Sequence, residues 1–408
     1  MSTIKSQAGQ QALTEPPRRG GLARYVLAAT LARSADGGAV VAVVLLVTTS
    51  GAPGWLAGVM GACITAPHLF GPFIARTLDT ARDGRNVIAL ACMAHGLTLA
   101  AAVVLYPVSW PLIPAALLIA SGMVGPLLTG GISSRLAGIA GNDRTSQRRA
   151  QGWDVATYGI GGTIGPSLVA AVSAWTNASV AALILAGSTF LAAAVIRLLP
   201  YVPPTGRPSE VPRPGQTLMM MVSRGVLRRT LYLTVVVALS VAALPIAAVA
   251  STQMLGVTPA AAGVLTAAYG LGGLVGSAGV MVRPLRSEAD TVMSRLAAAV
   301  GVALLVVSVA ATFPLAVAAF VFAGVLNSYF FAATLAARSE YAPAEARAQV
   351  FVWIGALKIT AGSAGTALAG AIVTSDSRLP LVLATGLVAV VVTVSVFDRQ
   401  FTVDCQPE

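Results

Sequence analysis

The feature that most constrains this chain is its series of long apolar segments. A helix of about 20 apolar residues crosses the hydrocarbon core of a bilayer. Twelve such segments can be marked, and short turns rich in Gly, Pro, Ser and Asn separate most of them. They span residues 22–49, 54–76, 86–106, 110–140, 152–174, 178–199, 230–253, 259–283, 292–312, 314–338, 349–374 and 379–398. The sequence therefore predicts an all-α integral membrane protein with twelve transmembrane helices.

Composition excludes other classes of protein. Hydrophobic residues make up 56% of the chain and charged residues only 10%, against about 45–50% and about 25% in soluble domains. The net charge of +11 comes from basic residues dispersed between apolar segments, which indicates orientation in a membrane rather than nucleic-acid binding. The 3 cysteines have neither metal-ligand spacing nor the pattern of a disulfide framework.

A proline-rich polar stretch at residues 200–229 reads as a linker between two halves. It separates six predicted helices in residues 22–199 from six in residues 230–398. Residues 1–21 and 399–408 are expected to be cytoplasmic tails. Because cytoplasmic loops collect Lys and Arg, the basic residues predict that both termini face the cytoplasm. The loops on that side contain Arg76, Arg82, Arg85, Arg144, Arg148, Arg149, Arg283, Arg286 and Arg347, whereas the opposite loops contain Arg378.

The two predicted halves contain a short internal sequence repeat. Arg149-Ala150-Gln151 recurs as Arg347-Ala348-Gln349, and three residues of the following helix recur 200 positions later. The three pairs are Trp153 and Trp353, Gly162 and Gly362, and Gly165 and Gly365. Two six-helix halves related by an internal repeat are typical of secondary transporters, whose substrate site lies between the halves near the membrane midplane.

The loop after the second predicted helix carries a family resemblance. Residues 71–85 begin at Gly71 and resemble an expanded form of the signature loop of the major facilitator superfamily, which has Gly, then Asp-Arg, then Gly-Arg. Ala75 stands where the family has its acid, so either Asp79 or Asp83 is expected to replace it. The resemblance implies a gating loop that locks against the other half; the alternative is a solvated loop that only fixes topology. Its other members would be Arg76, Arg82, Gly84 and Arg85.

The fifth predicted helix carries a second, more specific resemblance. Gly152, Gly161 and Gly165-Pro166 look like the antiporter motif of the drug:proton branch of that superfamily, although Val169-Ala170 replaces its two final glycines. Small residues four apart let two helices approach closely, and a proline bends a helix. We expect a close contact between the halves here, which suits an exporter. The alternative is ordinary packing of small residues.

Charged residues within the apolar segments are candidates for proton coupling, because such residues usually face a cavity or a partner. Arg33 and Asp36 lie three apart on one helix and are expected to pair. Asp36 is the first candidate for the proton carrier and Asp154 the second. The alternative for Asp36 is a static ion pair with Arg33. The alternative for Asp154 is a carboxylate stabilised by the dipole at a helix N-terminus. Lys358 is either a cavity cation or the partner of an acid in the other half.

Aromatic and amide side chains are expected to line a pocket for an amphipathic compound. The candidates are His68, Tyr158, Tyr269, Asn327, Tyr329 and Phe330. His68 and His95 have no ligand-like neighbours in sequence, so we expect no metal site, no cofactor and no catalytic residues.

Together these patterns predict a proton-coupled exporter of a small lipophilic organic compound, working by alternating access. A proton-coupled importer of the same fold is the main alternative. A membrane enzyme acting on lipid-linked substrates would need a convergent polar set, which the sequence lacks. We expect a monomer in the lipid bilayer, with a small molecule and protons as its partners and no nucleic acid. The high Ala, Gly, Val and Arg content is typical of a protein from a GC-rich bacterial genome. We therefore expect the protein to lie in a bacterial cell membrane.

Overall fold

The computed structural model describes residues 20–403 except 142, 204–207, 260 and 374. Every regular element among these residues is a helix, and twelve spans are long and apolar enough to cross a membrane. The predicted fold class is therefore confirmed. Residues 1–19 of the expected N-terminal tail and residues 404–408 of the expected C-terminal tail lie outside the described residues.

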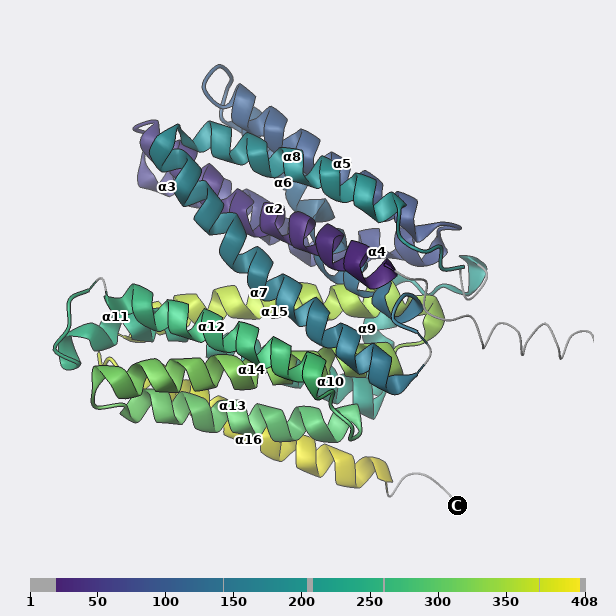
Figure 1. Ribbon diagram of the computed structural model, residues 1–408, viewed down its shortest axis with the longest axis vertical. Helices are drawn as coiled ribbons and strands as arrows, with labels where there is room; N and C mark the ends of the chain where they lie inside the picture. The colour runs from purple at the N-terminus through teal and green to yellow at the C-terminus, as the bar shows by residue number, and fades with distance from the viewer. Residues whose placement is uncertain (1–19, 142, 204–207, 260, 374, 404–408) are drawn as a thin grey trace, which may run out of the picture.

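The first six spans make up the upper half of the molecule in Figure 1. The second span is divided among three elements, and the fourth ends in a π-helical turn. In chain order the elements are α2 (Gly21–Thr49), α3 (Gly54–Thr65), η1 (Ala66–Phe70), α4 (Gly71–Thr80), α5 (Gly84–Leu105), α6 (Leu112–Pro126), η2 (Leu127–Gly131), η3 (Leu136–Gly138), α7 (Arg144–Trp175) and α8 (Ala178–Arg197).

The other six spans make up the lower half, which is joined to the first by η4 (Pro208–Glu210) and the short helix α9 (Pro214–Ser223). The seventh span consists of two helices, with Pro245 in the first turn of the second. The spans comprise α10 (Gly225–Val241), α11 (Leu244–Met254), α12 (Ala261–Val282), α13 (Ala289–Val309), α14 (Phe313–Tyr341), η5 (Ala344–Ala346), α15 (Arg347–Ile372) and α16 (Leu379–Val403).

Two neighbouring spans are broken within the first half. Pro67 lies at the start of the 3₁₀ helix η1, and Pro126 ends α6 just before η2. Because proline lacks an N–H group and clashes with the preceding turn, it interrupts the α-helical ladder, and such irregular turns often occur at functional sites. Helix α6 packs on η1, so both irregularities lie side by side. They place His68 of η1 in the interior of the first half, where it is 4% exposed.

Glycines allow the closest helix packing in both halves. A Cβ on Gly165 of α7 would collide with the carbonyl oxygen of Ser34 on α2. In the second half, a Cβ on Gly324 of α14 would collide with the carbonyl oxygen of Tyr269 on α12. These contacts bring the backbones together, as small residues do in membrane proteins. They also fix how far each helix can rotate about its axis, and hence which side chains meet.

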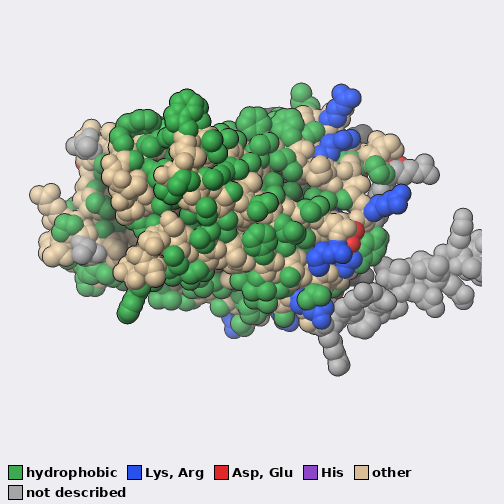
Figure 2. Space-filling view, turned by 90° about the horizontal axis from the view of Figure 1, so that it is seen from above, with side chains coloured by type: hydrophobic (Ala, Val, Ile, Leu, Met, Phe, Trp, Pro, Cys, Tyr) green, Lys and Arg blue, Asp and Glu red, His purple; other side chains and the backbone are tan. Residues whose placement is uncertain are grey.

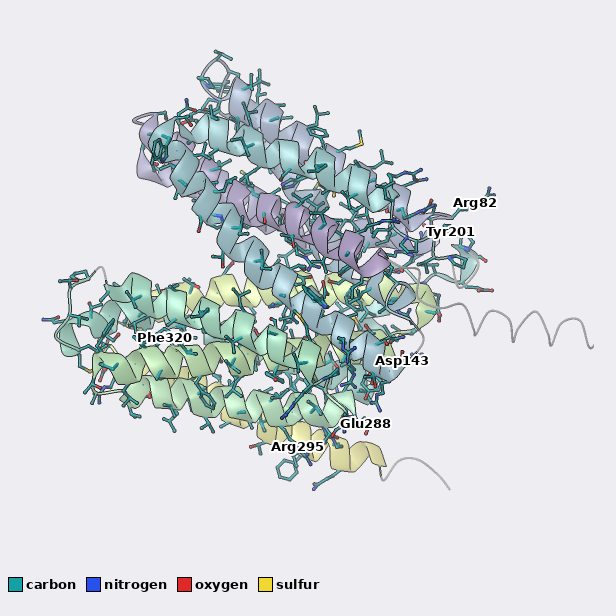
Figure 3. The ribbon with its side chains drawn as sticks, viewed as in Figure 1. Arg82, Asp143, Tyr201, Glu288, Arg295 and Phe320 are labelled. Atoms are coloured by element: carbon teal, nitrogen blue, oxygen red, sulfur yellow. The ribbon has the colours of Figure 1, made fainter. Side chains whose placement is uncertain are left out.

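The two ends of the molecule differ in charge and in packing. At one end, here called the basic end, lie Arg76, Arg82, Arg144, Arg149, Arg283 and Arg286, and Lys and Arg side chains gather there in Figure 2. The described chain begins and ends on this side, and Asp143, Arg82 and Tyr201 also lie there (Figure 3). The opposite end, formed by the turns at residues 50–53, 176–177 and 255–258, is here called the distal end. The two halves diverge toward it (Figure 1).

Contacts along α7 locate where the halves separate. Positions for a Cβ on Gly152 and Gly159 lie 3.0 Å and 3.5 Å from atoms of Met281 and Leu274 on α12. A Cβ on Gly162, one turn further toward the distal end, would meet no atom within 4 Å. On α15, Val352 packs against Gly71 and Gly130, whereas a Cβ on Gly355 or Gly362 would meet nothing within 4 Å. The tight packing between the halves is therefore concentrated toward the basic end.

Candidate functional site

The two halves meet near the centre of the molecule through a pair of aromatic rings. Tyr158 of α7 and Phe331 of α14 pack edge to face, with ring centroids 5.0 Å apart. Edge-to-face pairs of this kind are favoured by the ring quadrupoles. Cationic side chains from both halves surround these rings, so we describe the site from this pair outward.

Arg33 of α2 lies on the first-half side of the ring pair, with its guanidinium carbon 3.6 Å from the centroid of Tyr158. It forms an ion pair of 2.7 Å with Asp154 of α7, and both side chains are almost fully buried. Arg33 also donates to the hydroxyls of Ser133 and Thr157 and to the carbonyl oxygen of Thr129. The expected Arg33–Asp36 pair is therefore wrong, because the packing of α2 on α7 turns Arg33 toward Asp154.

Asp154 accepts two further hydrogen bonds. Tyr25 donates to it at 2.6 Å, and Ser133 donates at 2.8 Å. Its carboxylate is thus held by three donors, Tyr25 and Arg33 of α2 and Ser133 just beyond η2 of the fourth span. The alternative placement of Asp154 at a helix N-terminus is also wrong, because α7 begins ten residues earlier, at Arg144, with Asp143 as its N-cap. A buried ion pair with these additional hydrogen bonds is expected to stabilise the first half, because removing either partner would leave a buried charge uncompensated.

Asp36, the first candidate for the proton carrier, faces His68 instead of Arg33. The Oδ1 atom of Asp36 lies 3.6 Å from Nε2 of His68, whose Nδ1 lies 3.0 Å from the carbonyl oxygen of Ile64. Both side chains are largely buried, and Oδ1 of Asp36 has no hydrogen-bond partner among the described residues. Gly125 packs directly against this pair, since a Cβ there would lie 2.7 Å from Nε2 of His68. The two side chains form an ion pair only when the imidazole of His68 is protonated.

Lys358 of α15 lies on the second-half side of the ring pair. Its ammonium nitrogen is 3.6 Å from the centroid of Phe331 and 5.8 Å from that of Tyr158, which is the geometry of a cation–π contact. In the described part of the chain no carboxylate oxygen lies within 4.0 Å of it. A charged side chain at mid-span costs about 2.5–3.5 kcal/mol on insertion scales, and no acidic side chain offsets that cost here.

Arg338 of α14 is a second cation without a carboxylate partner among the described residues. Its side chain is 1% exposed, and its Nε atom is buried without a hydrogen-bond acceptor. The guanidinium carbon lies 5.9 Å from the centroid of Phe331 and 5.8 Å from that of Phe351. The sequence did not indicate Arg338 as a site residue, because it is the last residue of the expected segment 314–338. An arginine at such a position is typical of the membrane interface. In the structure α14 continues to Tyr341.

Asp79 connects the two halves at the basic end. Its two carboxylate oxygens accept hydrogen bonds from the backbone N–H groups of Ala348 and Gln349, at 2.9 Å and 3.0 Å. These amides lie in the first turn of α15, where the helix dipole favours an anion. Of the two acids that the sequence offered for the gating loop, Asp79 is the one in contact with the opposite half.

A second seam at the basic end joins α7 to the second half. Arg148 of α7 is 1% exposed and forms an ion pair of 2.7 Å with Glu340 of α14. It also donates to the carbonyl oxygens of Leu285 and Ser287 in the loop after α12. Arg144 reaches the same carboxylate at 3.3 Å. The two seams together hold the basic end of the molecule shut.

The remaining gating-loop residues stay within the first half or contact the linker. Asp83 caps α5 and pairs with Arg85 at 2.8 Å, and hydrogen bonds from Arg85 hold the pKa of Asp83 below its usual range. Arg76 donates to the linker carbonyl of Val211. Gly84 lies against the guanidinium of Arg135, whose pKa is lowered by burial. The side chain of Arg82 is exposed. The expected second span, 54–76, is longer than predicted, because residues 77–80 of the signature loop also belong to α4.

The glycines of the antiporter-like motif contact two different partners. Gly161 and Gly165 pack on α2, against Arg33 and Ser34, inside the first half. The expected contact of these two glycines with the other half is therefore wrong; Gly152 makes one instead, on α12. Pro166 lies within α7, which runs unbroken to Trp175. The close approach of α7 to α2 is also what brings Asp154 to Arg33.

The other expected cavity residues divide into two groups. Tyr269 of α12 and Asn327 of α14 are partly exposed and hydrogen-bonded at 2.8 Å, and Tyr329 lies against Gly279. Phe330, by contrast, is 3% exposed and packs in the core of the second half. Its assignment to a cavity is therefore wrong, because α14 turns Phe331 and not Phe330 toward α7. No group of three or more potential metal ligands comes together in the part of the chain that is described.

No protein-family model matches the sequence, and no curated protein matches it. Solved structures do match. The human organic anion transporter MFSD10 (TETRAN) superposes with a TM-score of 0.74 at 15% identity, over 93% of this chain and 100% of that one. A bacterial homologue of the iron transporter ferroportin, in an outward-facing state, gives 0.72 at 13% identity over 93% and 99%. The Escherichia coli fucose:proton symporter FucP gives 0.68 at 13% identity over 92% and 99%.

The chain has the major facilitator fold. Its twelve apolar spans and these matches make it a multi-pass membrane protein. In the major facilitator fold two six-helix halves lie side by side and face each other at a central interface, as they do here. The ring pair Tyr158–Phe331 and the cations around it lie where these halves meet.

Proposed function

We propose that this protein is a secondary transporter that exports a small lipophilic organic compound in exchange for protons. The observation that carries the proposal is the uneven contact between its halves. Asp79, Arg148 and Gly152 tie the halves together at the basic end, whereas α7 and α15 have open space beside Gly162 and Gly362 nearer the distal end. A molecule closed at one end and parted at the other is one of the two states that alternating access requires.

The charge distribution supports an orientation for this state. Basic residues concentrate at the end that also holds both ends of the described chain, and the positive-inside rule assigns such an end to the cytoplasm. The structure then corresponds to an outward-facing state in a bacterial cell membrane. Two of the matched transporters, the ferroportin homologue and FucP, were captured in outward-facing conformations.

The proton-carrying role is assigned to Asp36 with His68. The two groups are 3.6 Å apart and form an ion pair only when the histidine is protonated. They lie on α2 and on the broken second span, so a change in their protonation acts on the irregular turn η1. Asp154 is less suited to the role, because three donors already hold its carboxylate. Export rather than import is inferred only from the resemblance of the α7 glycine pattern to the antiporter motif, because Gly161 and Gly165 do not make the expected contact with the other half.

The test uses inverted membrane vesicles from a bacterial host that lacks its own exporters. An imposed proton gradient is followed with a pH-sensitive acridine dye while a panel of lipophilic compounds is added. An exported compound consumes the gradient and restores dye fluorescence. We expect this response to fall at least tenfold in Asp36→Asn, because an amide cannot release a proton. Asp376→Asn, which alters an exposed acid in the distal turn before α16, is the matched control and should keep full activity.

Three outcomes separate the parts of the proposal. Undiminished exchange in Asp36→Asn removes Asp36 from the coupling mechanism. Gradient consumption only in right-side-out vesicles reverses the direction and makes the protein a proton-coupled importer. If no compound of the panel consumes the gradient in either orientation, proton-coupled transport itself is contradicted.

A further inference from the structure

The centre of the molecule carries more positive charge than its own acids neutralise. Arg33 is matched by Asp154 at 2.7 Å. Lys358 and Arg338 have no such partner, since no carboxylate oxygen of the described residues lies within 4.0 Å of either. No proton of the Lys358 ammonium group is used in a hydrogen bond to the described residues. Charges within a membrane protein are normally paired, so these two cations favour a counter-ion supplied by a bound molecule.

The two unpaired cations lie at different depths along one aromatic surface. Helix α14 runs toward the basic end and α15 runs away from it. Phe331 and Arg338 are seven residues apart on α14, and Phe351 and Lys358 are seven residues apart on α15, which is about 10 Å along each helix. Lys358 lies over Phe331, and Arg338 lies beside Phe351 nearer the basic end. Lys358 is partly exposed, whereas Arg338 is enclosed.

We propose that the cargo is an organic anion whose carboxylate, or a similar acidic group, pairs with Lys358. This inference rests on the proposed transport function and names its substrate class. An ammonium group supplies three donors for an acidic oxygen, and the rings of Phe331 and Tyr158 beside it bind the apolar body of such a compound. Arg338 provides the second, deeper positive charge, which stays enclosed while the basic end is sealed. A neutral lipophilic compound leaves both cations uncompensated, so the structure favours an anion.

The sequence makes a direct test possible, because the chain contains only two lysines, Lys5 and Lys358. The full-length protein in detergent is treated with formaldehyde and a mild borohydride, which methylate accessible amines, and the modification of each lysine is followed by mass spectrometry. The probes are 1-naphthoate, 1-naphthalenesulfonate and the uncharged isostere 1-naphthamide. Lys5 reports any direct effect of a probe on the reagent.

We expect the two anions to slow the modification of Lys358 at least fivefold, with Lys5 unchanged, and the amide to have no effect. A binding titration with 1-naphthoate supplies a second readout. Lys358→Gln should weaken binding at least tenfold, and Lys358→Arg, which keeps the charge, should retain most of it. Arg378→Gln, which removes a cation at the distal end, is the matched control and should bind as the unmodified protein does.

The proposal is overturned if Lys358 does not react at all, if neither anion protects it, or if the amide protects as well as the acids do. It is also overturned if Lys358→Gln binds 1-naphthoate with unchanged affinity. The vesicle assay separates this failure from that of the transport function. If neutral compounds are transported with protons and Lys358 has no role, the proposal of an anionic cargo fails but the proposed transport function is retained. If an anion binds at Lys358 but is not transported, the proposed transport function fails but the anion-binding site is retained.

Discussion

The two halves repeat their helix packing but not their charges. Positions 165 and 365, which are 200 residues apart, are both glycines at a close helix contact: a Cβ on either would collide with a carbonyl oxygen, of Ser34 on α2 or of Leu239 on α10. Gly162 and Gly362 repeat as well, since a Cβ at either would meet nothing within 4 Å. At the same spacing, however, Asp154 corresponds to Ile354, which is fully buried.

Tyr158 corresponds in turn to Lys358, and the two side chains face each other across the centre of the molecule. The first half thus pairs its buried arginine internally, whereas the second half presents an unpaired cation to the same rings. Backbone packing has to repeat, because both halves must form the same six-helix bundle. The charges are free to diverge, because the packing of the helix backbones does not depend on them. The difference supports a structural role for the Arg33–Asp154 pair and underlies our proposal that the second half binds the cargo.

The largest expected effect comes from breaking the charge pair of the first half. Asp154→Asn leaves Arg33 buried without a counter-charge, and removing one partner of a buried pair costs about 3–5 kcal/mol. We expect a large loss of thermal stability in detergent, measured by the temperature at which the protein unfolds. The double variant Arg33→Met with Asp154→Asn should recover much of the loss, since it removes the orphaned charge. If Asp154→Asn alone unfolds at the same temperature as the unmodified protein, the pair does not have this structural role.

Because the two halves share the same glycine contacts, matched glycine substitutions should lower the thermal stability of the protein equally in each half. Gly165→Ala and Gly365→Ala each force a methyl group against a carbonyl oxygen, and overpacking of this kind costs about 1–3 kcal/mol. Gly162→Ala and Gly362→Ala add the same methyl group where no atom lies within 4 Å, and they should be nearly neutral. The four variants are compared by thermal unfolding. A large effect at only one of the first two positions would show that the halves do not share this packing.

The smallest expected effect concerns the seams at the basic end. Asp79→Asn removes the charge from the carboxylate that caps α15 and one of its two acceptor oxygens. A hydrogen bond to a charged group contributes about 1.5–3 kcal/mol, and 1.4 kcal/mol is a factor of ten. We therefore expect hydrogen exchange at the amides of Ala348 and Gln349 to become about tenfold faster.

Asp83→Asn is the matched control for this measurement. Asp83 belongs to the same segment but pairs with Arg85 and Arg197 of its own half. Exchange at Ala348 should be unchanged in this variant. Equal acceleration in both variants would mean that the amides report a general loosening of the basic end rather than release of the Asp79 contact.

The number of spans, the two halves and the basic residues between them could be read from the sequence, because each depends on composition along one stretch of chain. The pairing of charges could not. Arg33 and Asp36 are neighbours on one helix, and local spacing favoured that pair. In the structure, glycines on α7 bring Asp154 to Arg33 and leave Asp36 to His68. The polar residues at the start of α7 also hid its true beginning, since a helix can extend beyond the apolar part of a span.

The sequence by itself determined that this protein spans a membrane twelve times, with a polar break between two similar halves and its arginines in alternate loops. These properties follow from the cost of placing polar groups in hydrocarbon, which acts on every segment separately. Only the tertiary structure decided which charges neutralise one another and which remain. That outcome depends on the rotation and depth of helices that are far apart in the chain. Within the described residues it left Lys358 and Arg338 beside Phe331 without a carboxylate partner.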